Sequence, residues 1–203
     1  MSNYEKLFIS LRYWLHGRNY MQAAEALHFA ACYHQGLRKD GTTPEFEHQL
    51  RIVHYLRTLE GNLIFPEPTL TTGILHDVVE DYDVSIREIN ALFGERVGNA
   101  VWRLTKKKNG IQLSMEEYYH AMEDDPIASI DKGADRIHNF QTMPGVFTVD
   151  KQREYIAETR AYILPMLKTA RRKFPRQELA YENVKSMLNS QIQLIEFAHA
   201  ATP

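Results

Sequence analysis

The stretch Ile74–Asp81 concentrates groups that can bind a metal ion or move a proton. His76 and Asp77 are adjacent, and Glu80 and Asp81 follow within the next four positions. In a helix adjacent side chains point about 100° apart, so one ion could contact His76 and Asp77 while Glu80 and Asp81 lie on roughly the same face. An imidazole and a carboxylate for a metal, with two more carboxylates beside them, are suited to activating a water molecule. The alternative is a set of solvated acidic residues at a helix end.

A second group of polar residues recurs every four positions and favours the metal-site interpretation. Asp131, Asp135 and Asn139 would share one face of a helix. One of these carboxylates could complete a site begun by His76 and Asp77. The alternative is a surface helix whose other side is buried, and both interpretations predict a helix here.

Two further histidines lie upstream, next to predicted helices. His34 begins a loop with two glycines that runs to Gly41. A helix is predicted to begin near Pro44, which places His48 in its first turns. A solitary histidine in such a position is more often a surface or core residue than a ligand, so the residues alone leave both roles open.

Taken in order, these segments resemble the alarmone hydrolase domain of the RelA/SpoT proteins, a branch of the HD-domain phosphohydrolases. The resemblance extends from about residue 23 to about residue 167, and its most specific segments are 74–81 and 132–139. It implies an all-α, HD-domain helical bundle around a single metal ion. The chain has no room for the synthetase and regulatory domains of the full-length proteins, so we expect a small, stand-alone hydrolase.

The resemblance also assigns a role to each candidate residue. It implies manganese, bound by His48, His76, Asp77 and Asp135. Glu80 and Asp81 match the acidic pair that positions or deprotonates the attacking water. The residues that match or are suited to substrate binding are Arg38, Lys39, Arg136, Asn139 and Thr142. The implied reaction removes the 3′-pyrophosphate from ppGpp or pppGpp and yields GDP or GTP plus pyrophosphate.

The chemistry of these residue types supports the same set. Two imidazoles and two carboxylates suit Mn²⁺, Fe²⁺ or Zn²⁺. A pyrophosphate carries much negative charge, so cations are expected nearby. Arg38, Lys39 and Arg136 are candidates, whereas the run Lys106–Lys108 is better interpreted as a solvated helix end.

The chain departs from the family pattern at three positions. Glu45 and Gln49 stand where the family usually has a tyrosine and a proline around the ligand histidine. Gly133 stands inside the predicted Asp135 helix and costs about 1 kcal/mol relative to alanine. These changes retain every candidate ligand, so they bear on the substrate more than on the metal.

Other functions fit parts of the pattern. An HD phosphohydrolase could act on another nucleotide, such as a nucleoside monophosphate or the 2′-phosphate of NADPH. A non-catalytic module could bind a nucleotide without cleaving it, although no candidate ligand is lost. A dioxygen-activating enzyme with two metals would need further histidines, and His120 lies in the right interval without an evident partner.

Length and composition set the remaining expectations. With 203 residues, the chain can form one HD-type domain, 1–203, with a core from about 20 to 170 and a helical extension from about 175 to 200. The formal charge of −2 lacks the excess of positive charge that is typical of proteins that bind duplex nucleic acid. The expected partner is therefore a small nucleotide. One cysteine excludes an internal disulfide framework, and no signal peptide or membrane-length apolar run is visible. We expect a reducing, cytoplasmic location and predict no oligomeric state.

Overall fold

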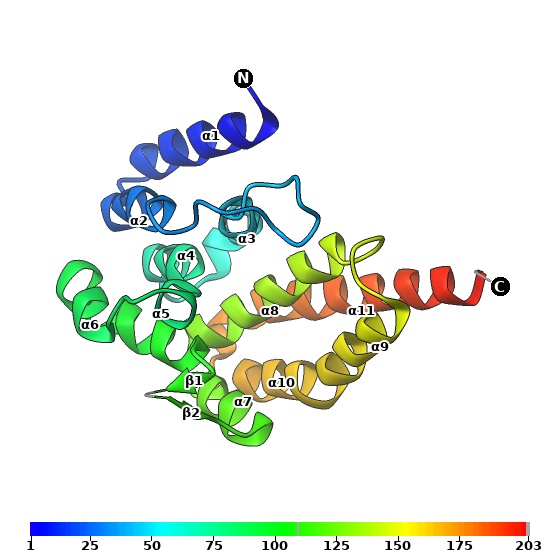
Figure 1. Cartoon of the computed structure of the whole chain (residues 1–203). Helices are drawn as coiled ribbons and strands as arrows, with labels where there is room; N and C mark the ends of the chain where they lie inside the picture. The colour runs from blue at the N-terminus through cyan, green and yellow to red at the C-terminus, as the bar shows by residue number, and fades with distance from the viewer. Residues whose placement is uncertain (109, 202–203) are drawn as a thin grey trace.

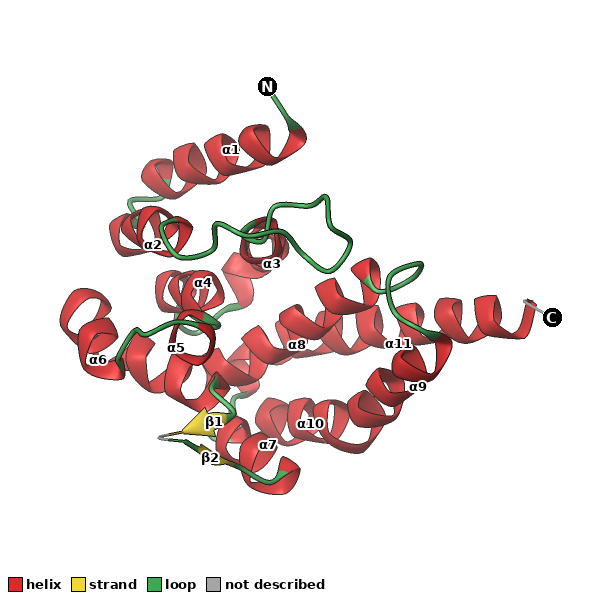
Figure 2. Cartoon of the chain, viewed as in Figure 1, coloured by secondary structure: helices red, strands yellow, loops and turns green. Residues whose placement is uncertain are grey.

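The helical periodicity of the sequence is confirmed along most of the chain. The computed structural model describes residues 1–108 and 110–201, and within them the regular structure is almost entirely helical (Figures 1 and 2). The α-helices are α1 (Asn3–Gly17), α2 (Met21–Ala31), α3 (Glu47–Leu56), α4 (Pro66–Leu75), α5 (Val78–Asp81), α6 (Ile86–Leu104), α7 (Met115–Glu123), α8 (Pro126–Thr142), α9 (Val149–Glu158), α10 (Leu164–Lys173) and α11 (Glu178–Ala201). Short 3-10 turns span Arg57–Asn62 and Pro175–Gln177, and a π-helical turn spans Thr159–Ile163. Sequence analysis did not predict a two-stranded antiparallel pairing, which joins β1 (Lys107–Lys108) to β2 (Ile111–Gln112).

Helix α8 is the central element of the bundle. It packs against α3, α4, α6, α7, α10 and α11, and Figure 1 shows it running beside α11. Its start is fixed by Asp125, whose carboxylate accepts hydrogen bonds from the amides of Ile127 and Ala128 at 2.8 and 3.1 Å. Gly133 permits the close contact with α11, because a Cβ there would lie 2.5 Å from the Val184 side chain. The glycine that weakens the isolated helix therefore lets two helices approach.

The segment that carries His76 and Asp77 is not the continuous helix that the sequence predicts. Helix α4 ends at Leu75, and α5 starts only at Val78. The Nδ1 atom of His76 lies 3.0 Å from the carbonyl oxygen of Gly73, the acceptor that a continuing helix would offer to the amide of Asp77. The imidazole thus competes with the backbone, and both residues lie in the turn between two helices.

The C-terminal third is helical throughout most of its length. A π-helical turn ahead of Pro165 joins α9 to α10. The predicted C-terminal extension is α11, which packs along α8 and α10. Residues 202 and 203 of the predicted domain lie outside the described part of the chain.

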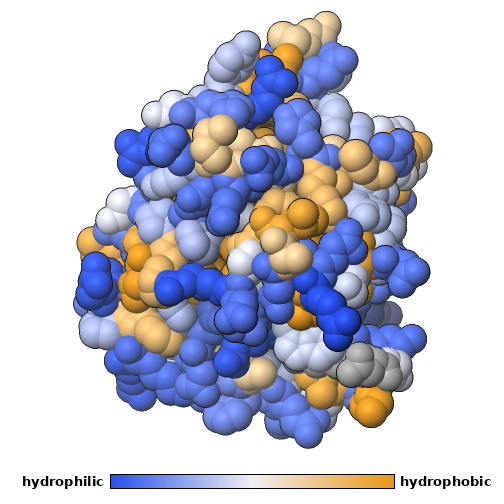
Figure 3. Space-filling model, turned by 90° about the vertical axis from the view of Figure 1, so that its left-hand side faces the viewer, coloured by the Kyte–Doolittle hydropathy of each residue, from blue (hydrophilic) through white to orange (hydrophobic). Residues whose placement is uncertain are grey.

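Among the described residues, no helix combines the length and the apolar character needed to span a bilayer. Figure 3 shows a face on which hydrophilic and hydrophobic groups are interspersed.

Candidate metal centre

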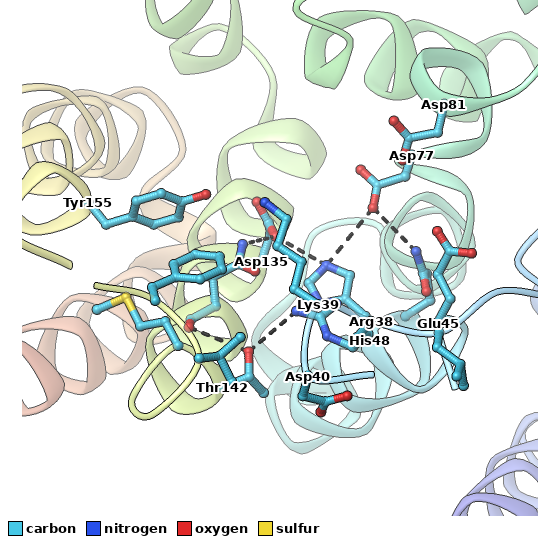
Figure 4. Close-up of a pocket in the computed structure, with 16 residues that line it drawn as sticks. Arg38, Lys39, Asp40, Glu45, His48, Asp77, Asp81, Asp135, Thr142 and Tyr155 are labelled. Atoms are coloured by element: carbon cyan, nitrogen blue, oxygen red, sulfur yellow. Dashed lines mark hydrogen bonds and ion pairs between the residues drawn. The ribbon is translucent and has the colours of Figure 1, made fainter. Parts of the chain in front are cut away.

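The structure brings four predicted ligands together from three parts of the chain. His48 comes from α3, Asp135 from α8, and His76 and Asp77 from the turn between α4 and α5. The Nε2 atom of His48 lies 3.3 Å from Asp135 Oδ1 and 4.0 Å from Asp77 Oδ2, and His76 Nε2 lies 3.0 Å from the same Asp77 oxygen (Figure 4). Ligand atoms of His48, His76 and Asp77 all lie within 4.8 Å of one another, a spacing that could hold one metal ion.

The two imidazoles present the same ring atom to this cluster. Each uses Nδ1 elsewhere: His76 bonds to the carbonyl of Gly73 at 3.0 Å, and His48 bonds to Nδ1 of His138 at 2.7 Å. Burial and the neighbouring His48 lower the pKa of His138 to about 3, so His138 is neutral and its Nδ1 can accept a hydrogen bond from Nδ1–H of His48. Nε2 is then the nitrogen of each ring that faces the carboxylates, the arrangement found in metal-binding histidines whose other ring nitrogen is hydrogen-bonded.

One atom of the cluster lacks a hydrogen-bond partner, which fits a metal ligand. His76 Nε2 is buried, and its 3.0 Å approach to Asp77 does not have hydrogen-bond geometry. Such an atom is costly to bury unless something else binds it. Together with the imidazole and carboxylate donors, this unpartnered nitrogen indicates that the residues present fit a divalent cation.

The charges of the cluster also suit a bound cation. Burial disfavours the charged form of His76, but Asp77 and Asp135 outweigh it and raise the pKa of His76 to about 9. Burial likewise opposes ionisation of Asp77, but His76 and His48 lower the pKa of Asp77 to about 2. The two carboxylates of the cluster therefore remain ionised and hold a positive charge between them.

Asp135 is held firmly by its own helix. Lys132 Nζ donates to Asp135 Oδ2 at 2.9 Å, and the side-chain amide of Asn139 donates to Oδ1 at 2.6 Å. Burial opposes ionisation of Asp135, but Lys132 and His48 keep its pKa well below the usual range. Asn139, predicted to bind substrate, lines the pocket, but its side-chain amide donates its hydrogen bond to Asp135.

A pocket of about 460 Å³ opens beside the cluster. It has the size of a small-molecule site. Its polar end contains His48, Asp77, Asp81 and Asp135, and Arg38 and Lys39 also line it. The opposite wall is formed by side chains from the end of α8, the following loop and α9: Met143, Val146, Phe147 and Tyr155. A ligand with an anionic group at one end and a flat apolar part at the other would match this division.

The loop that carries the two cations is held by its own aspartate. Asp40 Oδ1 accepts from the amides of Thr42 and Thr43, both at 2.8 Å, and the Thr43 hydroxyl donates to Oδ2 at 2.5 Å. These bonds lower the pKa of Asp40 to about 2. Arg38 donates to the Thr142 hydroxyl at 3.3 Å, and the Lys39 ammonium lies 5.0 Å from the centre of the Phe147 ring. The structure thus brings Arg38, Lys39 and Thr142 to the pocket, as the sequence predicts.

The two members of the acidic pair point to different places. Asp81 lines the pocket, and burial together with the charges of Asp77 and Glu80 raises the pKa of Asp81 to about 6. Glu80 is not among the pocket-lining residues, and its Oε2 accepts the backbone amide of Lys106 at 2.7 Å. In this arrangement Asp81 is the carboxylate placed to exchange a proton at the pocket.

Arg136, a predicted cation of the site, does not line the pocket, and neither do Lys106 and Lys107, for which a solvated position was predicted. Arg136 is buried, donates to Glu158 at 2.6 Å and to the carbonyl of Tyr155 at 3.1 Å, and so supports the pocket wall indirectly. In the lysine run, the Lys106 ammonium contacts the Met115 sulfur, Lys107 is exposed, and the side chain of Lys108 lies outside the described residues.

Sequence reasoning missed several residues that shape the site. Glu45 and Gln49 line the pocket, and they were noted only as departures from a family pattern. Phe147 and Tyr155 form its wall, but nothing in their local sequence distinguishes them from other half-buried aromatics. For Gln49, the available signal was its position directly after His48 on the helix that enters the site.

Comparisons with known proteins agree with this geometry. A family model described as the HD domain matches residues 26–163, and this range contains all four predicted ligands. A solved structure of a metazoan ortholog of SpoT, described as hydrolysing ppGpp and acting in starvation responses, has a TM-score of 0.59 at 24% identity and covers 80% of this chain and 93% of that chain. At that identity, the likeness supports the all-helical HD fold.

Curated relatives match the same region. A probable guanosine-3′,5′-bis(diphosphate) 3′-pyrophosphohydrolase of Synechocystis is 34% identical over 146 residues, which cover 68% of this chain and 19% of the relative. A GTP pyrophosphokinase of Myxococcus xanthus is 33% identical over 150 residues and is covered to the same extent, 19%. The chain thus spans less than a fifth of the length of these relatives. The resemblance predicted from the motifs is confirmed.

Proposed function

The chain belongs to the HD-domain family, and we propose that it hydrolyses the 3′-pyrophosphate of ppGpp or pppGpp to give GDP or GTP plus pyrophosphate. The observation that carries the proposal is the convergence of His48, His76, Asp77 and Asp135 beside a pocket that also holds Arg38 and Lys39. The name of the Synechocystis relative supports the choice of substrate. Because that substrate is a cytoplasmic nucleotide, we propose a cytoplasmic location.

The four clustered side chains would hold a divalent ion, and we propose Mn²⁺. Such an ion, when bound, would lower the pKa of a water and offset negative charge on the pyrophosphate. The ionised state of Asp77 and Asp135 suits them to this role. His138 and the carbonyl of Gly73 keep the two imidazoles in the orientation that leaves Nε2 available.

Asp81 is the proposed proton acceptor for the attacking water. A general base works best when its pKa lies near the working pH, and that of Asp81 is raised to about 6. Glu80, bound to the Lys106 amide, would stabilise the short helix that carries Asp81. The proposal therefore gives the two acidic residues separate tasks.

The remainder of the pocket would bind the nucleotide. Arg38 is planar and can pair with phosphate or stack on a purine, and Lys39 adds positive charge beside the Phe147 ring. The wall that includes Phe147 and Tyr155 adds aromatic surface against which a base could pack. Both features fit a charged purine nucleotide.

The direct test is to incubate the purified protein with ppGpp and Mn²⁺ and to identify the products by anion-exchange chromatography and mass spectrometry. We expect GDP and pyrophosphate, and no reaction when a chelator removes the metal. NADPH and nucleoside monophosphates should be assayed in parallel. Two orthophosphates as primary products, or rapid cleavage of another nucleotide while ppGpp remains intact, would move the enzyme to a different phosphohydrolase function.

A further inference from the structure

Gln49 occupies a position that neither the ligand set nor the proposed reaction uses. It is 1% exposed, follows His48 on α3, and lines the inner end of the pocket. Its amide nitrogen Nε2 lies 3.2 Å from Asp77 Oδ2, within hydrogen-bond distance. In Figure 4, two dashed lines reach the Asp77 carboxylate, and this contact is the one on the side of Glu45.

The oxygen that Gln49 contacts is the one that faces both imidazoles. Asp77 Oδ2 lies 3.0 Å from His76 Nε2 and 4.0 Å from His48 Nε2. A donor fixed on this oxygen selects the side-chain orientation in which the carboxylate faces the cluster. The opposite orientation of the Gln49 amide would put its carbonyl oxygen against an ionised carboxylate, so the contact defines which end of the amide is the donor.

Asp77 needs such a partner more than Asp135 does. Asp135 accepts hydrogen bonds from Lys132 and Asn139, both on its own helix. Asp77 lies in a turn, its side chain is 34% exposed, and in the described part of the chain Gln49 is the one hydrogen-bond donor to its carboxylate. Without that donor, its side chain could turn toward the open pocket.

Gln49 is itself held from the far side. Its Nε2 atom also lies 3.5 Å from Nε2 of His34, a buried ring that stacks on Phe46 with a ring-centre distance of 6.0 Å. His34 Nε2 can accept a hydrogen bond from Gln49 only if the ring proton of His34 lies on Nδ1. That Nδ1 atom is 3.8 Å from Glu45 Oε1. His34 thus contacts Gln49 on the side away from Asp77, with Glu45 beside it at a distance too long for a hydrogen bond.

From these contacts we infer that Gln49 is a positioning residue for the metal, which orients the carboxylate of Asp77 toward the ion. The inference rests on the metal site of the proposed function but not on the identity of the nucleotide. Loss of such a supporting hydrogen bond to a ligand typically weakens metal affinity about 10- to 100-fold.

The test measures the Mn²⁺ affinity of the chelator-treated 203-residue chain by calorimetric titration, without any nucleotide. Gln49→Met keeps the length of the side chain and removes the donor, and Gln49→Asn keeps the amide but shortens its reach by one carbon–carbon bond. We expect the Kd for Mn²⁺ to rise about tenfold or more in both variants. Wild-type affinity in the folded Gln49→Met variant would overturn the inference.

Gln177→Met is the matched control for loss of a buried glutamine. Gln177 is also 1% exposed, but it bonds to the backbone of Ile64 and Pro126 at 3.0 and 2.7 Å, away from the pocket. It should lower the melting temperature and leave Mn²⁺ affinity unchanged. Gln49→Met should weaken Mn²⁺ binding and change the melting temperature little. The melting temperature is spared because the substitution removes an Oε1 atom that is already buried without a partner.

The two proposals fail in different ways. If the protein leaves ppGpp intact while Gln49→Met weakens Mn²⁺ binding, the proposed substrate is wrong and the role of Gln49 is supported. If the protein cleaves ppGpp and both Gln49 variants bind Mn²⁺ like the wild type, the reaction is supported and the role of Gln49 is overturned.

Discussion

The two halves of the candidate site differ in how firmly the fold holds them. His48 and Asp135 lie on the long helices α3 and α8, are 4% and 7% exposed, and are held by His138, Lys132 and Asn139. The other half lies on the turn after α4 and on the four-residue helix α5, where His76 is buried but the Asp77 side chain is 34% exposed and Glu80 and Asp81 are exposed. The buried half is suited to holding an ion in place, whereas the exposed half can adjust to a substrate and exchange protons with solvent.

The largest effect is expected when the buried half loses a ligand. His48→Ala removes the imidazole that lies near both carboxylates. We expect Mn²⁺ affinity to fall at least about 100-fold and hydrolysis to fall to background, measured by metal analysis and product formation. His54→Ala, in the same helix but outside the pocket lining, is the control and should retain both. If His48→Ala retained its metal, the ion would have to be held elsewhere.

A loss of rate without loss of metal is expected from the exposed half. Asp81→Asn removes the proposed proton acceptor, so kcat should fall about 10²- to 10⁴-fold while metal content stays near the wild-type value. Glu80→Gln should cost less than about tenfold, because Glu80 contacts the Lys106 amide instead of the pocket. Rates and metal content of both purified variants decide the matter. A larger loss of kcat in Glu80→Gln would show that Glu80 leaves Lys106 during the reaction.

The pH dependence separates the same two residues. The raised pKa of Asp81, about 6, means that it is protonated below that pH and cannot accept a proton. The value of kcat/KM for ppGpp should therefore rise with pH through about 6 and then level off. A profile recorded for Asp81→Asn should lack this inflection. An inflection that persists in the variant would assign it to another group.

Much of this arrangement could be predicted, since the family resemblance implies all four clustered residues and helical periodicity predicts most of the elements that carry them. The break between α4 and α5 could not be predicted, because it depends on whether the His76 ring bonds to the carbonyl of Gly73. The direction of Arg136 also escaped prediction. Its partner, Glu158, lies on another helix, and helical periodicity gives the face of a residue but not the element packed against it.

A smaller effect is expected where the substrate meets the loop of residues 37–44. Arg38 lines the pocket, and among the described residues the hydrogen-bond partner of its guanidinium group is the Thr142 hydroxyl. Arg38→Ala removes a charged contact made in both ground and transition states, so KM for ppGpp should rise about tenfold with kcat little changed. Steady-state kinetics test this, and a loss confined to kcat would instead place Arg38 at the reacting phosphate.

The smallest effect on activity is expected at Asp131, one turn before Asp135 on α8. Asp131 is 2% exposed, and neither of its carboxyl oxygens has a hydrogen-bond partner among the described residues. Burial raises its pKa well above the usual value, so the folded state retains a proton that the unfolded chain releases above about pH 4. Stability from this group is therefore fully present at low pH and declines as the pH rises toward the folded pKa.

Asp131→Asn has nearly the same shape and does not ionise. Relative to the wild type, its free energy of unfolding should increase by about 1.4 kcal/mol per pH unit above pH 4, until the folded pKa is reached. Urea denaturation of the chelator-treated proteins at several pH values measures this difference, and kcat should stay near the wild-type value. A difference that does not change with pH would mean that Asp131 is ionised in the fold. Its charge would then belong to the metal-holding half of the site, because His76 is the positive group that acts most strongly on it.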